Sequence, residues 1–378
     1  MEKRFQRGIG ILLVFMLVLG FAACGGGGEA FEPPTTPVPP ELLVPPTPVE
    51  SPASPTPTET LDSPTPSEPG GTSPVIVTGG RAVDGRETVF VAVIRTDGTL
   101  WEADLGLADP PGFVQIGSGT WKSLAMGRAH TMAVNTDGSL WGWGWNEHGQ
   151  LGDGTTEDRQ APVQIGIDTD WASVWAGWGQ TVALKTDGSL WAWGLWEMDE
   201  AGQPVDVGRH LPVQVGPDTD WASLSTRGIG FPMAIKTDGS LWILWPAPVQ
   251  IGYSTDWASV DSGGMAIKTD GSLWALDGMI AWAEYGGPVP MPVQVGTDTD
   301  WASVVGGLGF WGLKTDGSLW GHYDFDATPV QVAAGRIWSA VSLWYGPLFA
   351  IDVDGGLWWY ERAMMFDFTT GEWVEETP

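Results

Sequence analysis

Aspartates at fixed spacing are the residues of this sequence with the clearest chemical potential. A Thr-Asp-Gly segment recurs along the chain, and an Asp-Thr-Asp-Trp segment recurs between its copies, as at 168–171. Carboxylate oxygens suit Ca²⁺, but a loop site needs several of them at alternating positions, and Asp-Thr-Asp supplies only two. Aspartate also caps its own turn through a local hydrogen bond. The sequence therefore favours turn capping over a calcium site, and it predicts no metal and no cofactor.

The sequence contains no clear set of catalytic residues. The histidines are His130, His148, His210 and His322. No Ser-His-Asp order, metal-spaced histidine cluster or Gly-rich phosphate loop is present. A pair of carboxylates could serve as acid and base in so acidic a chain, but nothing in the pattern selects one pair. No catalytic residue is predicted, and a binding protein is favoured over an enzyme.

The single cysteine, Cys24, has a predicted chemistry of its own. It follows a basic start and an apolar run over residues 9–21 that is short for crossing a bilayer, which is the pattern of a secretory signal peptide. The Phe-Ala-Ala-Cys segment that ends at Cys24 resembles the lipobox of bacterial lipoproteins, which implies acylation of Cys24. An ordinary leader with a chance cysteine is the alternative. We expect residues 1–23 to be a lipoprotein signal peptide and the mature chain to be extracytoplasmic, membrane-anchored at the bacterial cell surface.

Residues 24–73 have the composition of a disordered linker. Fifteen of the 30 prolines lie between Pro33 and Pro74, interleaved with Thr, Ser and Glu, and the segment contains no Lys or Arg. Such a sequence cannot bury enough apolar surface to offset the entropy of ordering. We therefore predict an extended stalk that follows Cys24 and carries a folded domain over residues 74–378.

The chain as a whole is strongly acidic, with 46 Asp and Glu against 17 Lys and Arg and a formal net charge of −29. Binding to phosphates needs clustered Lys and Arg, so nucleic acid is excluded as a partner. Anionic lipid surfaces are disfavoured for the same reason, and contact with the membrane is expected through the lipid anchor only.

The aspartates are positioned by a repeated hairpin. The segment Thr-Asp-Gly-Ser-Leu-Trp or a close variant of it occurs seven times, and Asp-Gly between two apolar runs is typical of a tight β-hairpin. The hairpin tryptophans are Trp101, Trp141, Trp191, Trp242, Trp274, Trp320 and Trp358. A unit of four short antiparallel strands repeated at this spacing predicts an all-β fold, a seven-bladed β-propeller with four-stranded blades.

Two further pieces recur in each unit. A Trp-Ala-Ser-Val strand, as at 171–174, opens the unit, and a Pro-Val-Gln strand, as at 212–214, ends it. The pattern leaves open whether the last strand belongs to its own blade or to the next one. Residues 372–375 are expected to be the fourth strand of the final blade, in the place of the missing Pro-Val-Gln strand. If each fourth strand instead belongs to the next blade, they would close the ring on the first blade.

The repeats carry a family resemblance. The second unit combines Gly-x-x-His at 127–130, the hairpin, and Asn146 to Thr155, which reads Asn-Glu-His-Gly-Gln-Leu-Gly-Asp-Gly-Thr. This combination resembles the repeat of the regulator of chromosome condensation family, which implies a seven-bladed propeller. Some secreted bacterial propellers of this repeat type inhibit β-lactamases, so the resemblance also suggests a protein partner.

Antiparallel strands fix which connections share a face. The aspartate-rich turns fall on one face, and the irregular loops fall on the other, where binding sites are usually found. Thirteen of the 25 tryptophans stand at repeat positions and are expected to be blade-packing residues. Some of the remaining twelve are expected to lie around one end of the central channel, and the alternative is that they fill gaps between blades. The predicted ligand-binding residues are Trp175, Trp178, Trp311, Trp344, Tyr345, Arg128 and Arg227.

The favoured function is a surface-tethered, monomeric propeller that binds an unidentified protein through its irregular face. Exposed tryptophan and tyrosine serve protein interfaces and sugar stacking alike, so a glycan-binding module is the first alternative. A lyase or hydrolase with its site at the central channel is the second.

Overall fold

The computed structural model describes the repeats and most of their connections. The described residues are 75–83, 86–105, 112–198, 204–205, 208–225, 232–244, 247–261, 263–276, 291–306, 310–322, 329–332, 334–343, 348–359, 364–367 and 372–375. The predicted signal peptide, Cys24 and the predicted linker lie outside these ranges. Within them, no helix has the length and apolarity that a membrane crossing requires.

The described strands form seven antiparallel sheets and one small two-stranded hairpin. In chain order the sheets consist of β1 (Val75–Val83), β2 (Arg86–Ile94), β3 (Leu100–Asp104) and β4 (Val114–Gln115); β5 (Trp121–Met126), β6 (His130–Asn135), β7 (Leu140–Gly144) and β8 (Arg159–Gln164); β9 (Trp171–Ala176), β10 (Gln180–Lys185), β11 (Leu190–Gly194) and β14 (Val213–Gln214); β15 (Trp221–Leu224), β16 (Met233–Lys236), β17 (Leu241–Ile243) and β18 (Val249–Gln250); β19 (Trp257–Val260), β20 (Met265–Lys268), β21 (Leu273–Ala275) and β22 (Val293–Gln294); β23 (Trp301–Gly306), β24 (Phe310–Lys314), β25 (Leu319–His322) and β26 (Val330–Val332); and β27 (Trp338–Leu343), β28 (Leu348–Asp352), β29 (Leu357–Trp359), β30 (Met364–Asp367) and β31 (Glu372–Glu375).

Each sheet is one blade, and we number the blades 1 to 7 and their strands A to D in chain order. In blades 1 to 6 the strands neighbour one another in the order A-B-C-D. Strand D pairs with strand C of its own blade, as where Gln214 lies opposite Trp191. This settles the point that the sequence left open, because no strand is exchanged between blades among the described residues.

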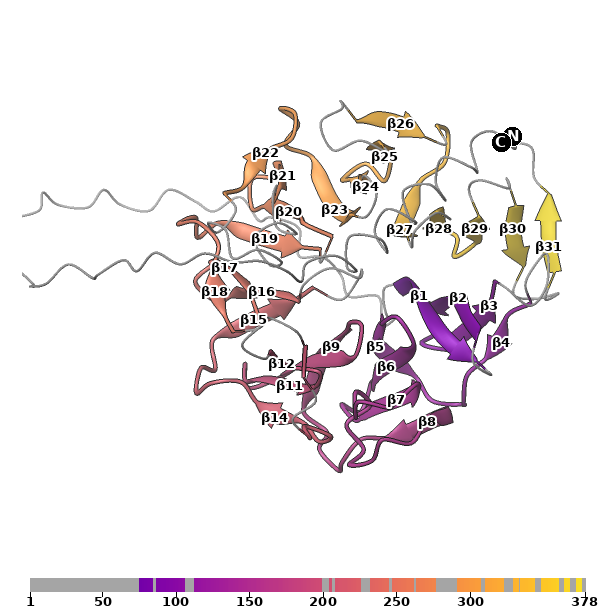
Figure 1. Cartoon of the computed structure of the whole chain (residues 1–378). Helices are drawn as coiled ribbons and strands as arrows, with labels where there is room; N and C mark the ends of the chain where they lie inside the picture. Colours follow the sequence, from indigo (N-terminus) through magenta and orange to yellow (C-terminus); the bar gives the residue numbers. More distant parts are fainter. Residues whose placement is uncertain are drawn as a thin grey trace, which may run out of the picture. The chain divides into compact units, whose positions relative to one another are not determined.

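The blades follow one another around a closed ring (Figure 1). An apolar cluster joins the first and last blades, where Ile76 and Val91 of blade 1 pack with Phe349 and Ile351 of blade 7. Equivalent clusters join each of the other neighbouring blades. The predicted fold class, a seven-bladed β-propeller, is confirmed, and the ring closes through side-chain packing.

Blade 7 departs from the expected pattern. It has five strands, with β30 in the D position and β31 paired outside it. The prediction that residues 372–375 form the D strand was wrong. The chain after β29 returns soon enough for Met364 to pair with Trp359, so the D position is already filled when the chain reaches Glu372.

Tryptophans at the two repeat positions pack against each other inside each blade. The indoles of Trp171 in strand A and Trp191 in strand C meet edge to face, with ring centroids 5.9 Å apart. The same contact recurs in four other blades, in the pairs Trp121–Trp141, Trp221–Trp242, Trp257–Trp274 and Trp338–Trp358. The strand A indole is buried in every case, and this geometry is the favourable one for aromatic pairs. The repeated tryptophans are therefore packing residues, as predicted.

Candidate functional site

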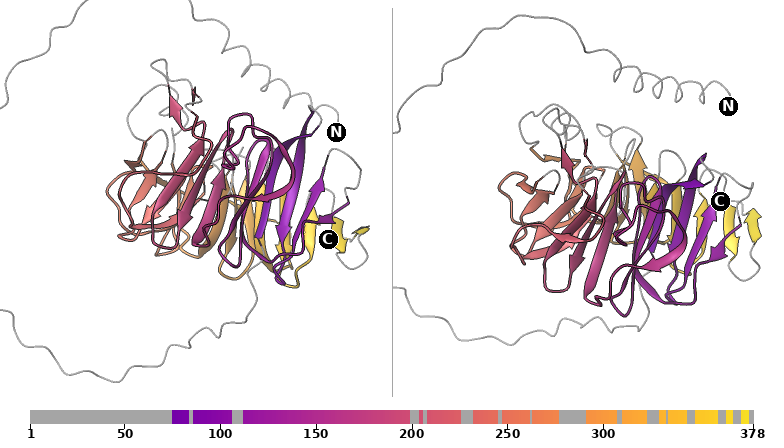
Figure 2. Two further views of the ribbon diagram at one scale, coloured as in Figure 1. Left: turned by 90° about the horizontal axis from the view of Figure 1, so that it is seen from below. Right: turned by 60° about the horizontal axis from the view of Figure 1, so that its bottom comes forward.

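The strand order gives the propeller two different faces. The B–C turns and the D–A connections lie on one face, which we call the turn face. The A–B and C–D connections lie on the other, which we call the loop face. A small hairpin of β12 (Glu197–Met198) and β13 (Pro204–Val205) belongs to the C–D connection of blade 3 and extends beyond the ends of the blades (Figure 2).

In blades 1 to 6 the aspartate of the B–C turn is held by its own hairpin. The Asp187 Oδ1 accepts hydrogen bonds from the Ser189 backbone N–H at 2.9 Å and from the Ser189 hydroxyl at 2.6 Å. The Ser189 hydroxyl in turn accepts a bond from the Trp191 indole N–H at 2.9 Å. These bonds from Ser189 lower the pKa of Asp187. The relay recurs at Asp97, Asp137, Asp238, Asp270 and Asp316. This is the turn capping that the sequence favoured.

The aspartates of the D–A connections are held by a lysine. The Lys185 Nζ, at the end of strand B, lies 2.6 Å from the Asp168 Oδ2 and 3.0 Å from the Asp170 Oδ1. It also lies 4.8 Å from the ring centroids of both Trp171 and Trp191. Burial alone would lower the pKa of Lys185, but the bonds to Asp168 and Asp170 raise it overall. We call this arrangement the lysine clamp.

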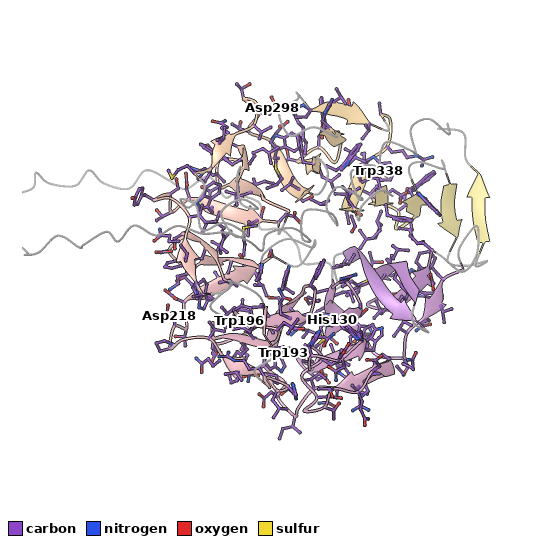
Figure 3. The ribbon with its side chains drawn as sticks, in the orientation of Figure 1. His130, Trp193, Trp196, Asp218, Asp298 and Trp338 are labelled. Atoms are coloured by element: carbon purple, nitrogen blue, oxygen red, sulfur yellow. The ribbon has the colours of Figure 1, made fainter. Side chains whose placement is uncertain are left out.

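The lysine clamp recurs in blades 4, 5 and 6. Lys236 contacts Asp218 and Asp220, and Lys314 contacts Asp298 and Asp300. Lys268 contacts one carboxylate, that of Asp256, and donates its other bond to the Ser254 hydroxyl at 3.1 Å. Figure 3 labels Asp218 and Asp298 at two of these connections. The carboxylates therefore serve turns and clamps, and no three His, Cys, Asp or Glu side chains of the described ranges are arranged to hold a metal ion.

Among the predicted tryptophans that the structure describes, Trp178 is the one with an accessible indole, on the loop face. Its side chain is 57 % exposed, and the Arg128 guanidinium lies 4.4 Å from its ring centroid. The two residues come from the A–B loops of blades 2 and 3, which are joined by a bond from the Arg128 N–H to the Gly177 carbonyl at 3.0 Å. A loop-face cation and an exposed indole are thus held side by side by backbone contacts.

Two other predicted residues are not where we expected them. Trp175 lies within β9 and Trp311 within β24, and both side chains are buried, at 1 % and 3 % exposure. Each packs between neighbouring blades, so the prediction that they line an open A–B loop was wrong. Trp175 is the fifth residue of β9 and Trp311 the second residue of β24, and strands that are covered on both sides show no alternating pattern that would mark their ends. Trp344, Tyr345 and Arg227 lie outside the described residues.

The segment that carried the family resemblance joins blade 2 to blade 3. Asn146 is buried, and its amide donates to the backbone carbonyls of Thr155 and Glu157 at 3.0 and 3.1 Å. This folds the loop so that the Gln150 carbonyl accepts bonds from the Thr181 hydroxyl at 2.7 Å and from the Trp193 indole at 2.8 Å. The segment therefore has a structural role, which its glycines and amides could have indicated.

His130 completes this link between the blades. Its Nε2 lies 2.9 Å from the Thr181 Oγ1, and Figure 3 shows it near Trp193. Because the Thr181 hydroxyl donates its proton to the Gln150 carbonyl, the imidazole must donate through Nε2. A second proton would sit on Nδ1, which is buried without a hydrogen-bond partner, so the neutral ring is favoured. Complete burial lowers the pKa of His130 to about 3. A side chain on Gly127 would meet both this ring and the Gly177 carbonyl, which explains the Gly-x-x-His spacing.

Comparison with known proteins identifies a family repeat in the same part of the chain. Two family models of the Regulator of chromosome condensation (RCC1) repeat match residues 137–184 and 121–150. The Ultraviolet-B receptor UVR8 of Arabidopsis thaliana is 45 % identical over 53 residues, which are 14 % of this chain and 10 % of that protein. Protein RCC2 of Homo sapiens is 51 % identical over 37 residues, which are 10 % and 7 % of the two chains. The chain thus matches about a tenth or less of the length of these curated relatives.

Solved structures resemble the chain over a longer range. Prp20p from Saccharomyces cerevisiae matches with a TM-score of 0.54 and 16 % identity, over 78 % of this chain and 81 % of that one. Human WBSCR16 matches with a TM-score of 0.53 and 14 % identity, over 68 % and 78 %. At these identities the likeness establishes the fold alone.

Proposed function

Residues 121–184 of this chain match the RCC1 repeat, and from that premise we propose that the chain is a binding propeller which holds a protein partner against its loop face. The observation that carries the proposal is the exposed indole of Trp178, stacked with the Arg128 guanidinium. Tryptophan and arginine are the residues most often found at the energetic centre of protein interfaces. A partner would bury both residues together.

The contacts that fix the positions of Arg128 and Trp178 favour binding. Arg128 and Trp178 lie on loops that follow β5 and β9, and the backbone bond between Arg128 and Gly177 fixes their relative position. The link through His130 and Thr181 holds the same two blades together just below. A preorganised surface loses less conformational entropy on binding than a mobile one does.

Proteins of the same fold bind protein partners. Yeast RCC1 (Prp20) was solved bound to Kap60, and Prp20p was studied for its binding to Gsp1p and histones. Those partners belong to those proteins, and this chain departs from them in most of its sequence. What we carry over is the class of function, a propeller that binds protein.

A matched pair of exposed aromatics tests the proposal. Trp178 lies on the loop face, and Tyr253, which is 93 % exposed, lies in a D–A connection on the turn face. Once a partner is isolated on the full chain, Trp178→Ala should weaken its binding about thirtyfold, while Tyr253→Ala should leave it unchanged. Isothermal titration calorimetry measures both, and equal melting temperatures exclude unfolding.

The opposite pattern would place binding on the turn face and overturn the proposal. A glycan array probed with the full chain tests the first alternative, a glycan-binding module. If Trp178→Ala abolished binding to an array glycan, and no protein partner depended on Trp178, the domain would be a glycan-binding module, because indoles also stack on sugar rings.

We also propose that the domain is tethered to the bacterial surface through Cys24. The support is the lipobox-like segment before Cys24 and the Pro-rich composition of residues 24–73. Cys24→Ser should release the protein from the membrane fraction into the medium, as measured by fractionation and immunoblotting. Retention of the variant in the membrane fraction would contradict the tether and would leave the proposed binding face untouched.

A further inference from the structure

One position on the turn face repeats in blades 2 to 7. The residue before the strand A tryptophan accepts, through its carbonyl, a bond from the backbone N–H of the first residue of the next B–C turn. At the junction of blades 2 and 3 this bond joins Thr186 to Asp170 at 2.8 Å. The two residues are therefore neighbours on the surface, and we call them a junction pair. The other pairs are Thr136–Thr120, Thr237–Asp220, Thr269–Asp256, Thr315–Asp300 and Val353–Ile337.

The last junction pair differs from the others in chemistry. The first five pairs combine threonine with threonine or aspartate, whereas blade 7 has Ile337 beside Val353. Their side chains are 54 % and 60 % exposed. Single exposed apolar residues are common on protein surfaces. Two of them side by side, where the repeat elsewhere has polar residues, form an apolar surface that the repeat itself does not require.

The cation and the carboxylate at this position of blade 7 come from residues outside the apolar pair. The strand B position that holds the clamp lysine elsewhere is Asp352, whose Oδ2 accepts a bond from the Trp358 indole at 2.7 Å. The cation comes instead from Arg336, whose guanidinium lies 3.7 Å from the Trp358 ring centroid. Blade 7 thus keeps both a cation and a carboxylate beside the strand C indole. The carboxylate comes from strand B and the cation from the D–A connection, which is the reverse of the lysine clamp.

Carboxylates border the apolar pair. A side chain on Gly317 would meet Ile337, so the turn of blade 6, with its exposed Asp316, lies to one side of the pair. Asp354 is the exposed residue after Val353. Hydrogen bonds from Ser318 lower the pKa of Asp316, so its charge is present at neutral pH. The whole chain carries a net charge of −29. An apolar contact point in these surroundings selects a partner with positive charges beside its own apolar group.

We propose that the Ile337–Val353 pair is a second docking site, which takes a polypeptide segment that has an apolar side chain flanked by lysine or arginine. The segment lies on the turn face, and the apolar side chain covers Ile337 and Val353 while its basic neighbours meet Asp316 and Asp354. The Pro-rich residues 24–73 of the chain itself do not fit this description, because they contain no Lys or Arg.

Synthetic peptides test this directly. The probe is a fluorescent peptide with one leucine flanked on both sides by lysine and arginine in a Gly-Ser frame, titrated into the full chain by fluorescence anisotropy. A second peptide replaces the leucine with glycine and keeps the charge. We expect the leucine peptide to bind more tightly than the glycine peptide, and the double variant Ile337→Ser, Val353→Ser to weaken the leucine peptide about tenfold or more.

A matched control comes from the same face. Ile167 is 90 % exposed in the D–A connection between blades 2 and 3, outside any junction pair. Ile167→Ser should leave peptide binding unchanged, as should Trp178→Ala on the loop face, so this test is independent of the function proposed above. Equal affinity of the two peptides, equal binding by the double variant and the wild type, or an equal loss in Ile167→Ser would overturn the proposal. Melting curves confirm that the variants are folded.

Discussion

Replacing His130 tests the link between blades 2 and 3 through its dependence on pH. The buried, neutral imidazole donates to the Thr181 hydroxyl, and burial lowers the pKa of His130 from 6.5 to about 3. Folding therefore favours the neutral ring. The stability that this ring contributes is fully present above pH 6.5 and is lost as the pH falls from 6.5 toward 3, because the unfolded chain binds the proton first.

The size of the effect follows from the shift. Each pKa unit corresponds to about 1.36 kcal/mol, so at about pH 4.5, roughly two units below the unfolded value, folding should lose ~2.7 kcal/mol through His130 alone. His130→Gln keeps an amide N–H for the Thr181 hydroxyl and cannot be protonated in this range. The variant should therefore lack this component of acid sensitivity, whatever its stability at neutral pH.

Urea unfolding followed by tryptophan fluorescence at about pH 7 and about pH 4.5 measures the difference. The capped aspartates have lowered pKa values, so protonating them in acid reduces the free energy of unfolding of both proteins. This contribution is the same in both and cancels in the comparison. The wild type should lose ~2.7 kcal/mol more than His130→Gln over this interval. Equal losses in the two proteins would show that His130 is accessible to water and would refute the neutral, buried link.

Three further predictions concern the scaffold. Lys236→Met removes contacts to two carboxylates and two indoles and should cost ~1–2 kcal/mol in urea unfolding, while Lys268→Met, with one carboxylate, should cost less; the reverse order would contradict the clamp. Ser189→Ala breaks the relay from Asp187 to the Trp191 indole and should cost ~1 kcal/mol by the same assay, and no change would mean that water replaces the hydroxyl at no cost. Deletion of residues 371–378 removes β31, which pairs with β30 alone, so the melting temperature should fall by no more than about 2–4 °C; a larger drop would show that β31 helps to close the ring.

The repeated hairpin could be predicted from the sequence because its interactions are local. Asp187, Ser189 and Trp191 are two residues apart, and their hydrogen bonds form within one turn. The same spacing recurs in six blades, so one pattern specified the turns, the strands beside them and the number of blades. The number of blades and the antiparallel order then assigned the connections to two faces.

The candidate site was predicted only in part. Trp178 follows Gly177, outside β9, and is exposed as expected, whereas Trp175 lies three residues earlier, inside the strand. Sequence alone did not show where strand A ends, because both sides of the strand are covered by neighbouring blades and every residue near its end is buried. The exposed pair Ile337 and Val353 also escaped notice, because these residues are 16 positions apart in the chain.

The contacts that only the tertiary structure decided join residues that are distant in the chain. Lys185 and Asp168 are 17 residues apart, and the clamp forms because strand B of one blade ends beside the connection from the blade before it. His130 and Thr181 are 51 residues apart and meet through the packing of two separate sheets. Short-range hydrogen bonds fix each hairpin whatever its neighbours do, but the pairing of distant side chains depends on how closely the blades pack. The glycines at Gly127 and Gly177 set that distance, since a side chain on Gly127 would push the two loops apart.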